Sequence, residues 1–205
     1  MNEIKNAAPW QHFLACIALG NDAQTEQAAQ AVGKEGDILL PNLAALLAHS
    51  DPDRRWWAVR ALAAVGTPAA YDRIVTALED SEADVRAAAA QGLGELGEQG
   101  LTTPAAISAL VRCLDDSSPL VARIVADGLA RIGEPAVPAL IAALQSASTP
   151  VRAGAARALS IIQPEKAVPA LCAALNDPSA IVTYYVEEAL ERMGVGLILF
   201  APHAS

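Results

Sequence analysis

Few residues of this sequence combine the types and the spacing that catalysis or metal binding requires. The adjacent acids Glu187 and Glu188 suggest a general acid and base, but neighbouring residues of a helix point about 100° apart, so a solvated helix face is the better interpretation. The three histidines, His12, His49 and His203, stand in separate segments, none beside a cysteine or carboxylate at metal-ligand spacing. We therefore expect a non-enzymatic protein with no catalytic residue, no metal and no cofactor.

The composition narrows the partner class and the compartment. The formal net charge is −9 and no lysine and arginine cluster exceeds a pair, so we expect neither nucleic acid nor an anionic membrane as a partner. No stretch approaches the roughly 18 apolar residues of a membrane span, and the apolar run at 13–19 lacks the features of a signal peptide. Three cysteines stand in apolar helical runs, which is typical of buried core residues and fits the cytoplasm: Cys16, Cys113 and Cys172.

Aromatic side chains and arginines are the residues best suited to binding a partner, because they dominate interaction hot spots. Trp56 and Trp57 put two of the three tryptophans side by side. In a helix both rings cannot face the same core. The helices that hold these side chains therefore decide which ring faces outward.

An internal repeat supplies these helices. Five segments of twenty residues align without a gap, and their first leucines are 31, 36, 30 and 31 residues apart. Each segment has a second leucine at one fixed place, preceded by a small residue. The segments are 47–66, 78–97, 114–133, 144–163 and 175–194.

Each repeat is predicted to hold two helices, A and B. Prolines such as Pro138 and Pro169 mark the first turn of helix A, where proline is tolerated. Residues suited to capping begin helix B, namely Asp51, Ser118, Ser148 and Ser179, with Glu82 the weakest. Glycines are expected to end it: Gly66, Gly97, Gly133 and Gly194.

The fold class that follows is all-α, an α-solenoid of about five helix pairs in a single domain. The repeats are predicted at about 37–69, 70–104, 105–134, 135–165 and 166–194. Residues 1–36 fit the pattern poorly and are expected to form a degenerate helical cap. The apolar tail at 195–205 is expected to fold over the last repeat, with a docking edge for a partner or a second copy as the alternative.

The repeat pattern L-x-D…V-R-x-A-A-x-x-L-x-x-x-G is carried by Leu78, Asp80, Val85, Arg86, Ala88, Ala89, Leu93 and Gly97. It resembles HEAT repeats, specifically the short HEAT-like repeat of phycobilisome lyases, over residues 37 to 194. The resemblance implies a solenoid in which helix B lines the concave face. It also implies relatives of the E/F type, which attach an open-chain tetrapyrrole to a phycobiliprotein cysteine, usually as a two-chain complex.

Two charged positions of the pattern predict a structural ladder between adjacent repeats rather than a catalytic site. The arginine recurs as Arg55, Arg86 and Arg152, and the turn aspartate as Asp80, Asp116 and Asp177. His49 and Ser146 replace the aspartate in the two remaining repeats.

The repeat register assigns the outward residues of helix B to one binding groove. Trp56 aligns with Arg123 and Tyr184 in an outward column, whereas Trp57 aligns with Tyr185 in a semi-buried column. The alternative is that Trp56 and Tyr184 lie flat on neighbouring helices as packing. The predicted groove residues are Trp56, Trp57, Arg60, Arg123, Asp127, Arg157, Tyr184, Tyr185 and Glu188.

Three functions fit this arrangement. The first is a non-enzymatic scaffold or adaptor whose groove binds a protein partner. The second, implied by the resemblance, is a bilin lyase subunit or bilin chaperone, with propionates of an open-chain tetrapyrrole on Arg123 or Arg157 and its pyrroles on Trp56 or Tyr184. The third is a self-assembling scaffold joined through the C-terminal tail, which also offers a site for a hetero-partner.

Overall fold

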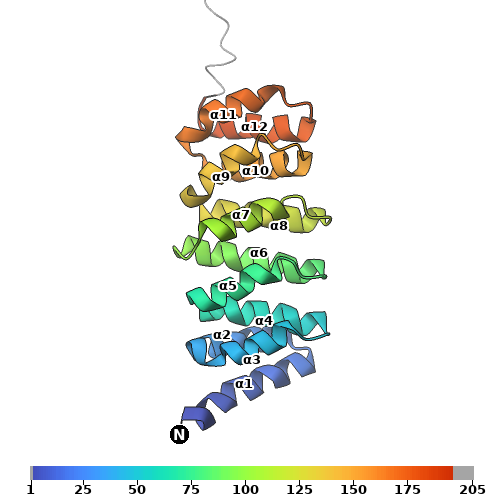
Figure 1. Cartoon of the computed structure of the whole chain (residues 1–205), viewed down its shortest axis with the longest axis vertical. Coiled ribbons are helices and arrows are strands. Elements are labelled where there is room, and N and C mark those ends of the chain that lie inside the picture. Colours follow the sequence, from blue (N-terminus) through green and yellow to red (C-terminus); the bar gives the residue numbers. More distant parts are fainter. Residues whose placement is uncertain (1, 196–205) are drawn as a thin grey trace, which may run out of the picture. The chain divides into compact units, whose positions relative to one another are not determined.

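The computed structural model describes residues 2–195, with side chains from residue 8 onward, and this part of the chain is all-α (Figure 1). None of its helices is long and apolar enough to cross a membrane. Since the structure describes the chain only as far as residue 195, the predicted tail lies outside the described residues from position 196 onward, as does His203. The α-helices are α1 (Asn2–Leu19), α2 (Asp22–Gly33), α3 (Leu40–Leu47), α4 (Pro52–Val65), α5 (Pro68–Ala77), α6 (Ala83–Glu98), α7 (Pro104–Cys113), α8 (Pro119–Ile132), α9 (Val137–Ala143), α10 (Thr149–Ile162), α11 (Val168–Ala173) and α12 (Ala180–Arg192).

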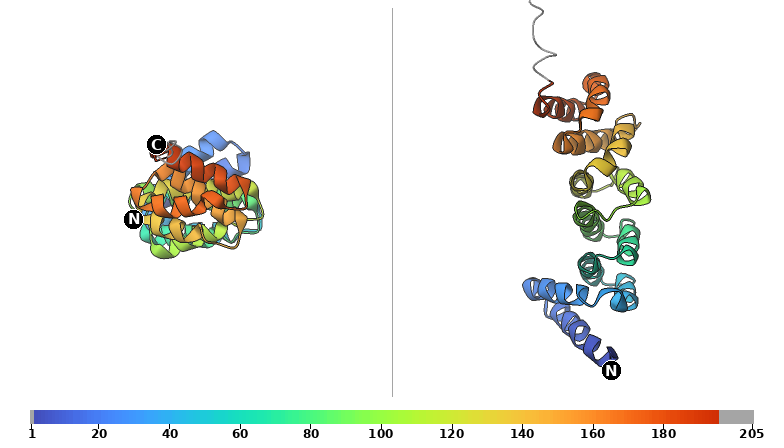
Figure 2. Two further views of the ribbon diagram at one scale, coloured as in Figure 1. Left: turned by 90° about the horizontal axis from the view of Figure 1, so that it is seen from above. Right: turned by 90° about the vertical axis from the view of Figure 1, so that its left-hand side faces the viewer.

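The chain forms two compact units, Met1–Thr102 (the first unit) and Thr103–Ser205 (the second unit). The A helices are α3, α5, α7, α9 and α11, and each is followed by its B helix. In the first unit α2 packs on α4 and α4 on α6, while α3 contacts α5 (Figure 2). In the second unit α8 packs on α10 and α10 on α12, while α7 contacts α9. Within each unit the A and B helices therefore form separate layers.

The starts of the B helices depend on a residue that sequence analysis had not assigned to capping. Asp51 accepts a hydrogen bond from the backbone N–H of Asp53, as expected of a cap. Ser118 and Ser179 also stand at the N-cap position, as predicted, but their side chains make no such bond. Instead, Asp116 and Asp177 accept the backbone N–H of the serine two residues later, at 2.8 and 2.9 Å.

The ends of the B helices follow the glycine prediction with one exception. Gly66, Gly133 and Gly194 adopt positive φ angles of 63°, 73° and 74°, which glycine tolerates at little cost. Gly97 lies inside α6, so its assignment as a helix end was wrong. Gln163 adopts the left-handed conformation at the end of α10, with φ of 56°.

The repeat leucines form the core. The second leucine of each repeat is at most 1% exposed, and burial of each such side chain stabilises the fold by about 1.5–3 kcal/mol. Glycines on α2 and α10 let these helices approach their neighbours closely. A Cβ added at Gly33 would lie 2.6 Å from the carbonyl oxygen of Ala64, and one added at Gly154 would lie 2.6 Å from Cδ2 of Leu114.

Residues 1–36, predicted as a degenerate cap, comprise α1 and α2 and bury side chains of their own. Phe13 and Val32 are fully buried and Cys16 is 2% exposed. Since α2 packs on α4 as α4 packs on α6, α2 occupies the place of a B helix. Burial of all three cysteines was expected, but Cys113 and Cys172 are half-buried.

Candidate functional site

The outward side of the B helices in each unit is called here the helix-B face, and the groove residues were predicted to lie on it. In the first unit Trp57 is 8% exposed and Trp56 is half-buried. The two rings meet edge to face with centroids 4.7 Å apart. Trp56 therefore spreads its ring between solvent and Trp57, and contributes packing as well as surface.

Arg60 of α4 is bound to acids on both neighbouring helices. Its Nη2 donates to Oε1 of Glu26 on α2 at 3.0 Å, and its Nη1 lies 3.6 Å from Oε2 of Glu95 on α6. Burial raises the pKa of the Glu26 carboxyl, but the hydrogen bonds from Arg60 and Gln30, together with the positive charge of Arg60, hold that pKa below its ordinary value. Arg60 thus connects α4 to both α2 and α6. Sequence analysis missed Glu26 because residues 1–36 did not align with the repeat.

Arg157 plays the same part in the second unit. Its Nη2 donates to Oδ1 of Asp127 on α8 at 2.8 Å, and its guanidinium carbon lies 5.8 Å from the ring centroid of Tyr185 on α12. A cation over an aromatic ring is attracted by the negative face of the ring. Two arginines predicted to contact a partner, Arg60 and Arg157, are therefore engaged between B helices.

Tyr184 and Arg123 are the predicted groove residues that reach furthest into solvent. Tyr184 is 58% exposed, and its ring meets that of Tyr185 at a centroid distance of 5.2 Å. Arg123 is exposed and makes no ion pair with any residue in the described part of the chain. Glu188, on the same helix as Tyr184, accepts a hydrogen bond from Arg192 at 2.7 Å.

The ladder residues join adjacent repeats at the turns before the B helices. Arg55 donates from Nε and Nη2 to the two carboxylate oxygens of Asp80, at 2.7 and 2.8 Å. Arg152 holds Asp177 in the same two-bond arrangement, at 2.7 and 3.1 Å. Such paired bonds between guanidinium and carboxylate are strong and directional. Arg86 donates to the backbone oxygen of Asp80 at 2.8 Å.

The turn position works even where aspartate is absent. In all five repeats its side chain accepts the backbone N–H two residues later. His49 does so through Nδ1 at 3.0 Å and Ser146 through Oγ at 3.2 Å. Any acceptor therefore serves the turn, whereas Asp80 and Asp177 also bind the arginine of the preceding repeat.

The repeated helix pairs match a known family. The sequence profile of HEAT repeats matches residues 39–126 and 107–191, which together cover more than half of the chain. The chain belongs to the HEAT-repeat family. No curated protein matches the sequence.

Solved structures share the fold of this HEAT-repeat protein. The complex of CpcE and CpcF of phycocyanin lyase from Nostoc sp. PCC7120 is similar at 26% identity and a TM-score of 0.56, over 74% of this chain and 98% of that chain. A mutant of Kap121p is similar at 17% identity and a TM-score of 0.56, over 85% of this chain and 22% of that chain. Kap95p with RanGDP is similar at 14% identity and a TM-score of 0.54, over 89% and 28%. The two Kap proteins are similar in fold alone.

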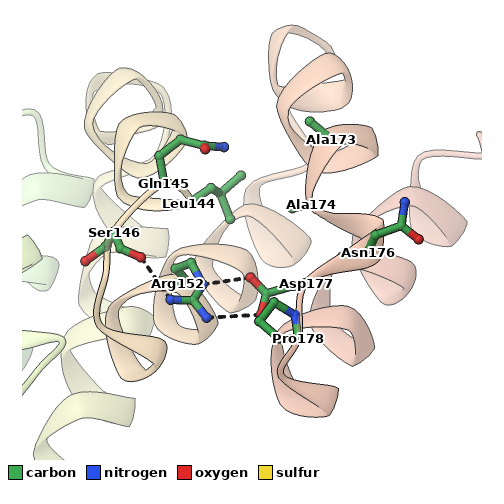
Figure 3. A pocket seen from close by; sticks show the side chains of 9 residues that line it. All are labelled: Leu144, Gln145, Ser146, Arg152, Ala173, Ala174, Asn176, Asp177 and Pro178. Atoms are coloured by element: carbon green, nitrogen blue, oxygen red, sulfur yellow. Dashed lines mark hydrogen bonds and ion pairs between the residues drawn. The ribbon is translucent and has the colours of Figure 1, made fainter.

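A shallow pocket of about 330 Å³ lies beside the second ladder pair of the HEAT-repeat protein. Figure 3 shows the guanidinium of Arg152 between Asp177 and the backbone oxygen of Ser146, to which it donates at 2.9 Å. The charges that line the pocket therefore bind each other. Its lining residues are Leu144, Gln145, Ser146, Arg152, Ala173, Ala174, Asn176, Asp177 and Pro178.

One histidine, His12, lies close to a cysteine, a pair that was not predicted from the sequence. Cys16 Sγ lies 3.6 Å from Nε2 of His12, one helical turn away on α1, so the statement that no histidine stands at metal-ligand spacing from a cysteine was wrong for this pair. Among the described residues no three side chains of the metal-binding types gather into one cluster. The pair alone supplies two ligands, fewer than a structural zinc site needs.

The Asp177 ion pair is expected to make stability depend on acid pH. The hydrogen bond from Arg152 holds the pKa of Asp177 below its ordinary value, against the opposing effect of burial. A carboxyl with a lowered folded-state pKa stabilises the fold above its unfolded pKa of about 3.9. That stability is lost as pH falls through the lower, folded-state value. Asp177→Asn keeps an oxygen for the Ser179 N–H, so it should lower the free energy of unfolding by about 1–2 kcal/mol at neutral pH.

Urea unfolding of wild type and Asp177→Asn between pH 3 and 7 measures this difference. The two curves should draw together as pH falls below about 4, because the carboxyl takes up a proton in the unfolded chain before it does so in the fold. Glu187→Gln is the control, since Glu187 is an exposed acid of the same unit without an ion pair in the described residues. A difference that stays constant across the pH range would contradict the prediction.

Proposed function

We propose that this HEAT-repeat protein is a non-enzymatic adaptor that binds a protein partner on its helix-B face. The observation that carries the proposal is the exposure of Tyr184, which is 58% exposed, whereas Phe13, Trp57 and Tyr71 are at most 8% exposed. Large exposed aromatics are enriched among binding hot spots. The cytoplasm is the expected location, because the three cysteines, odd in number, fit a reducing compartment.

The surroundings of Tyr184 favour rigid presentation of its ring. Tyr185 supports the ring edge to face, and Tyr185 itself lies under the guanidinium of Arg157. Because Asp127 fixes Arg157 in turn, the side chains below Tyr184 are held before a partner arrives. An anchor that is already ordered loses little conformational entropy on binding. The neighbouring charges set the register of the partner more than its affinity.

A pull-down from the lysate of the native host tests the proposal. Wild-type bait is compared with the Trp56→Ala/Tyr184→Ala double variant and with Tyr184→Ala alone, after circular dichroism shows that all are folded. We expect a partner that wild type captures and both variants lose, since a hot-spot aromatic contributes about 2 kcal/mol or more. Capture of the same proteins by all three baits contradicts a partner site on the helix-B face.

A second candidate is favoured by one comparison. The similarity to the CpcE and CpcF complex, at 26% identity, supports a bilin lyase subunit or bilin chaperone of the E/F type. In that case Arg123, which has no ion pair within residues 8–195, is better placed than Arg157 to hold a propionate. Adding an open-chain tetrapyrrole and recording its visible absorption tests this candidate. A band shift that Arg123→Ala abolishes supports it, and an unchanged spectrum contradicts it.

A further inference from the structure

Four of the exposed large apolar side chains stand on the B helices of the second unit. Leu120 of α8, Ile161 of α10, and Ile181 and Tyr184 of α12 are between 43% and 58% exposed. Within residues 8–195 two other large apolar side chains are this exposed, and both belong to the first unit. A concentration of exposed apolar surface on neighbouring helices marks an interaction site.

The helices α8, α10 and α12 each have an apolar residue at the same position of the repeat, and these three residues form an apolar row. The first turns of α8, α10 and α12 place Leu120, Pro150 and Ile181 at this position, and all three are exposed. Since α10 packs on both α8 and α12, the row crosses three adjacent helices. At about 10 Å between packed helices, it spans about 20 Å. The same position in the first unit holds the exposed acids Asp53 and Asp84.

One exposed positive charge lies beside the apolar row, although the whole chain has a net charge of −9. Arg123 lies one turn after Leu120 on α8 and is exposed, without an ion pair to any described residue. The outward columns of α8, α10 and α12 hold four arginines and two carboxylates: Arg123, Arg131, Arg157, Arg192, Asp127 and Glu188. Because Arg157 pairs with Asp127 and Arg192 with Glu188, Arg123 is the arginine that offers its charge to an acidic side chain of a partner.

We infer that the helix-B face of the second unit binds an acidic, amphipathic segment of a protein partner. Apolar side chains of the segment lie on the row of Leu120, Pro150 and Ile181, and an acidic side chain pairs with Arg123. A helix of about 13 residues spans the 20 Å of the row, and amphipathic helices bind other helical proteins in this way. Asp53 and Asp84 repel the same segment from the first unit. The inference deepens the proposed function and rests on it.

Fluorescence anisotropy with three labelled helical peptides of fourteen residues tests the inference. The first peptide has leucines on one face and glutamates on the other, the second has lysines in place of the glutamates, and the third has serines in place of the leucines. We expect the first to bind at least tenfold more tightly than the others, and more weakly as salt is raised. Ile181→Ser and Arg123→Glu should each weaken it at least fivefold. Leu19→Ser, at an exposed leucine of the first unit, should leave it unchanged.

Several outcomes overturn the inference. These are no binding of the first peptide, equal or tighter binding of the lysine peptide, and binding that Ile181→Ser does not weaken. If Tyr184→Ala still abolishes capture of a lysate partner, the proposed function stands and the acidic segment is wrong. Binding of an open-chain tetrapyrrole that depends on Arg123, without binding of the peptide, also overturns it.

Discussion

Gly33→Ala is expected to destabilise the first unit by about 2 kcal/mol, although alanine is the better helix former. A Cβ at this position would lie 2.6 Å from the carbonyl oxygen and 2.7 Å from the Cβ of Ala64. Because the first of these atoms belongs to the backbone, α2 must move away from α4. The shift also lengthens the 3.0 Å bond between Arg60 and Glu26.

Urea unfolding followed by circular dichroism measures this loss. Gly92→Ala is the matched control, because its Cβ would meet Ala63 Cβ at 3.3 Å, a contact that a small shift relieves. We expect Gly92→Ala to change the free energy of unfolding by less than about 1 kcal/mol. Equal stabilities of Gly33→Ala and wild type would mean that α2 and α4 do not approach as closely as described.

Leu159→Ala is expected to lower the free energy of unfolding by about 3 kcal/mol, the largest effect of any single change considered. Leu159 is fully buried on α10, which packs on both α8 and α12. Truncation leaves a cavity that these neighbours share. Since each helix pair of a repeat protein is stabilised mainly by its neighbours, loss of amide protection in hydrogen exchange should concentrate in α8, α10 and α12.

Ile161→Ala is the control for this change, because Ile161 lies two residues later on the same helix and is 43% exposed. It should cost less than about 1 kcal/mol. Similar losses from Leu159→Ala and Ile161→Ala would contradict the assignment of the repeat leucine to the core. Protection lost equally in α2 and α4 would contradict the local spread of the effect.

The fold could be predicted from the sequence because the repeat register is visible in it. Two leucines in each repeat, with a small residue before the second, predict helix pairs and a shared core. The order of exposure on α4 also follows from register, since Trp57 is buried and Trp56 lies further out. Periodicity carries this information because every repeat repeats it.

The partners of the outward charges could not be predicted in the same way. Arg60 pairs with Glu26, which stands 34 residues earlier in a segment without a recognisable repeat, so the repeat register could not predict this pair. Arg157 meets Asp127 one repeat earlier and Tyr185 one repeat later. Register places each residue on a face, but side-chain reach decides which neighbours it contacts. Arg60 and Arg157 were therefore predicted from the sequence as groove residues, whereas in the structure they connect neighbouring helices.

Gly154 limits how this chain can be rearranged. Its missing side chain makes room for Leu114 from the preceding repeat, and the same register position holds Trp57, Ala88, Ile124 and Tyr185 elsewhere. The size of the side chain at this position therefore suits each helix pair to one particular neighbouring pair. Shuffling, duplicating or deleting whole repeats would set a large side chain against a filled space, or a small one against an empty space. The repeats share one arrangement of helices, but one repeat cannot replace another without loss of packing between neighbours.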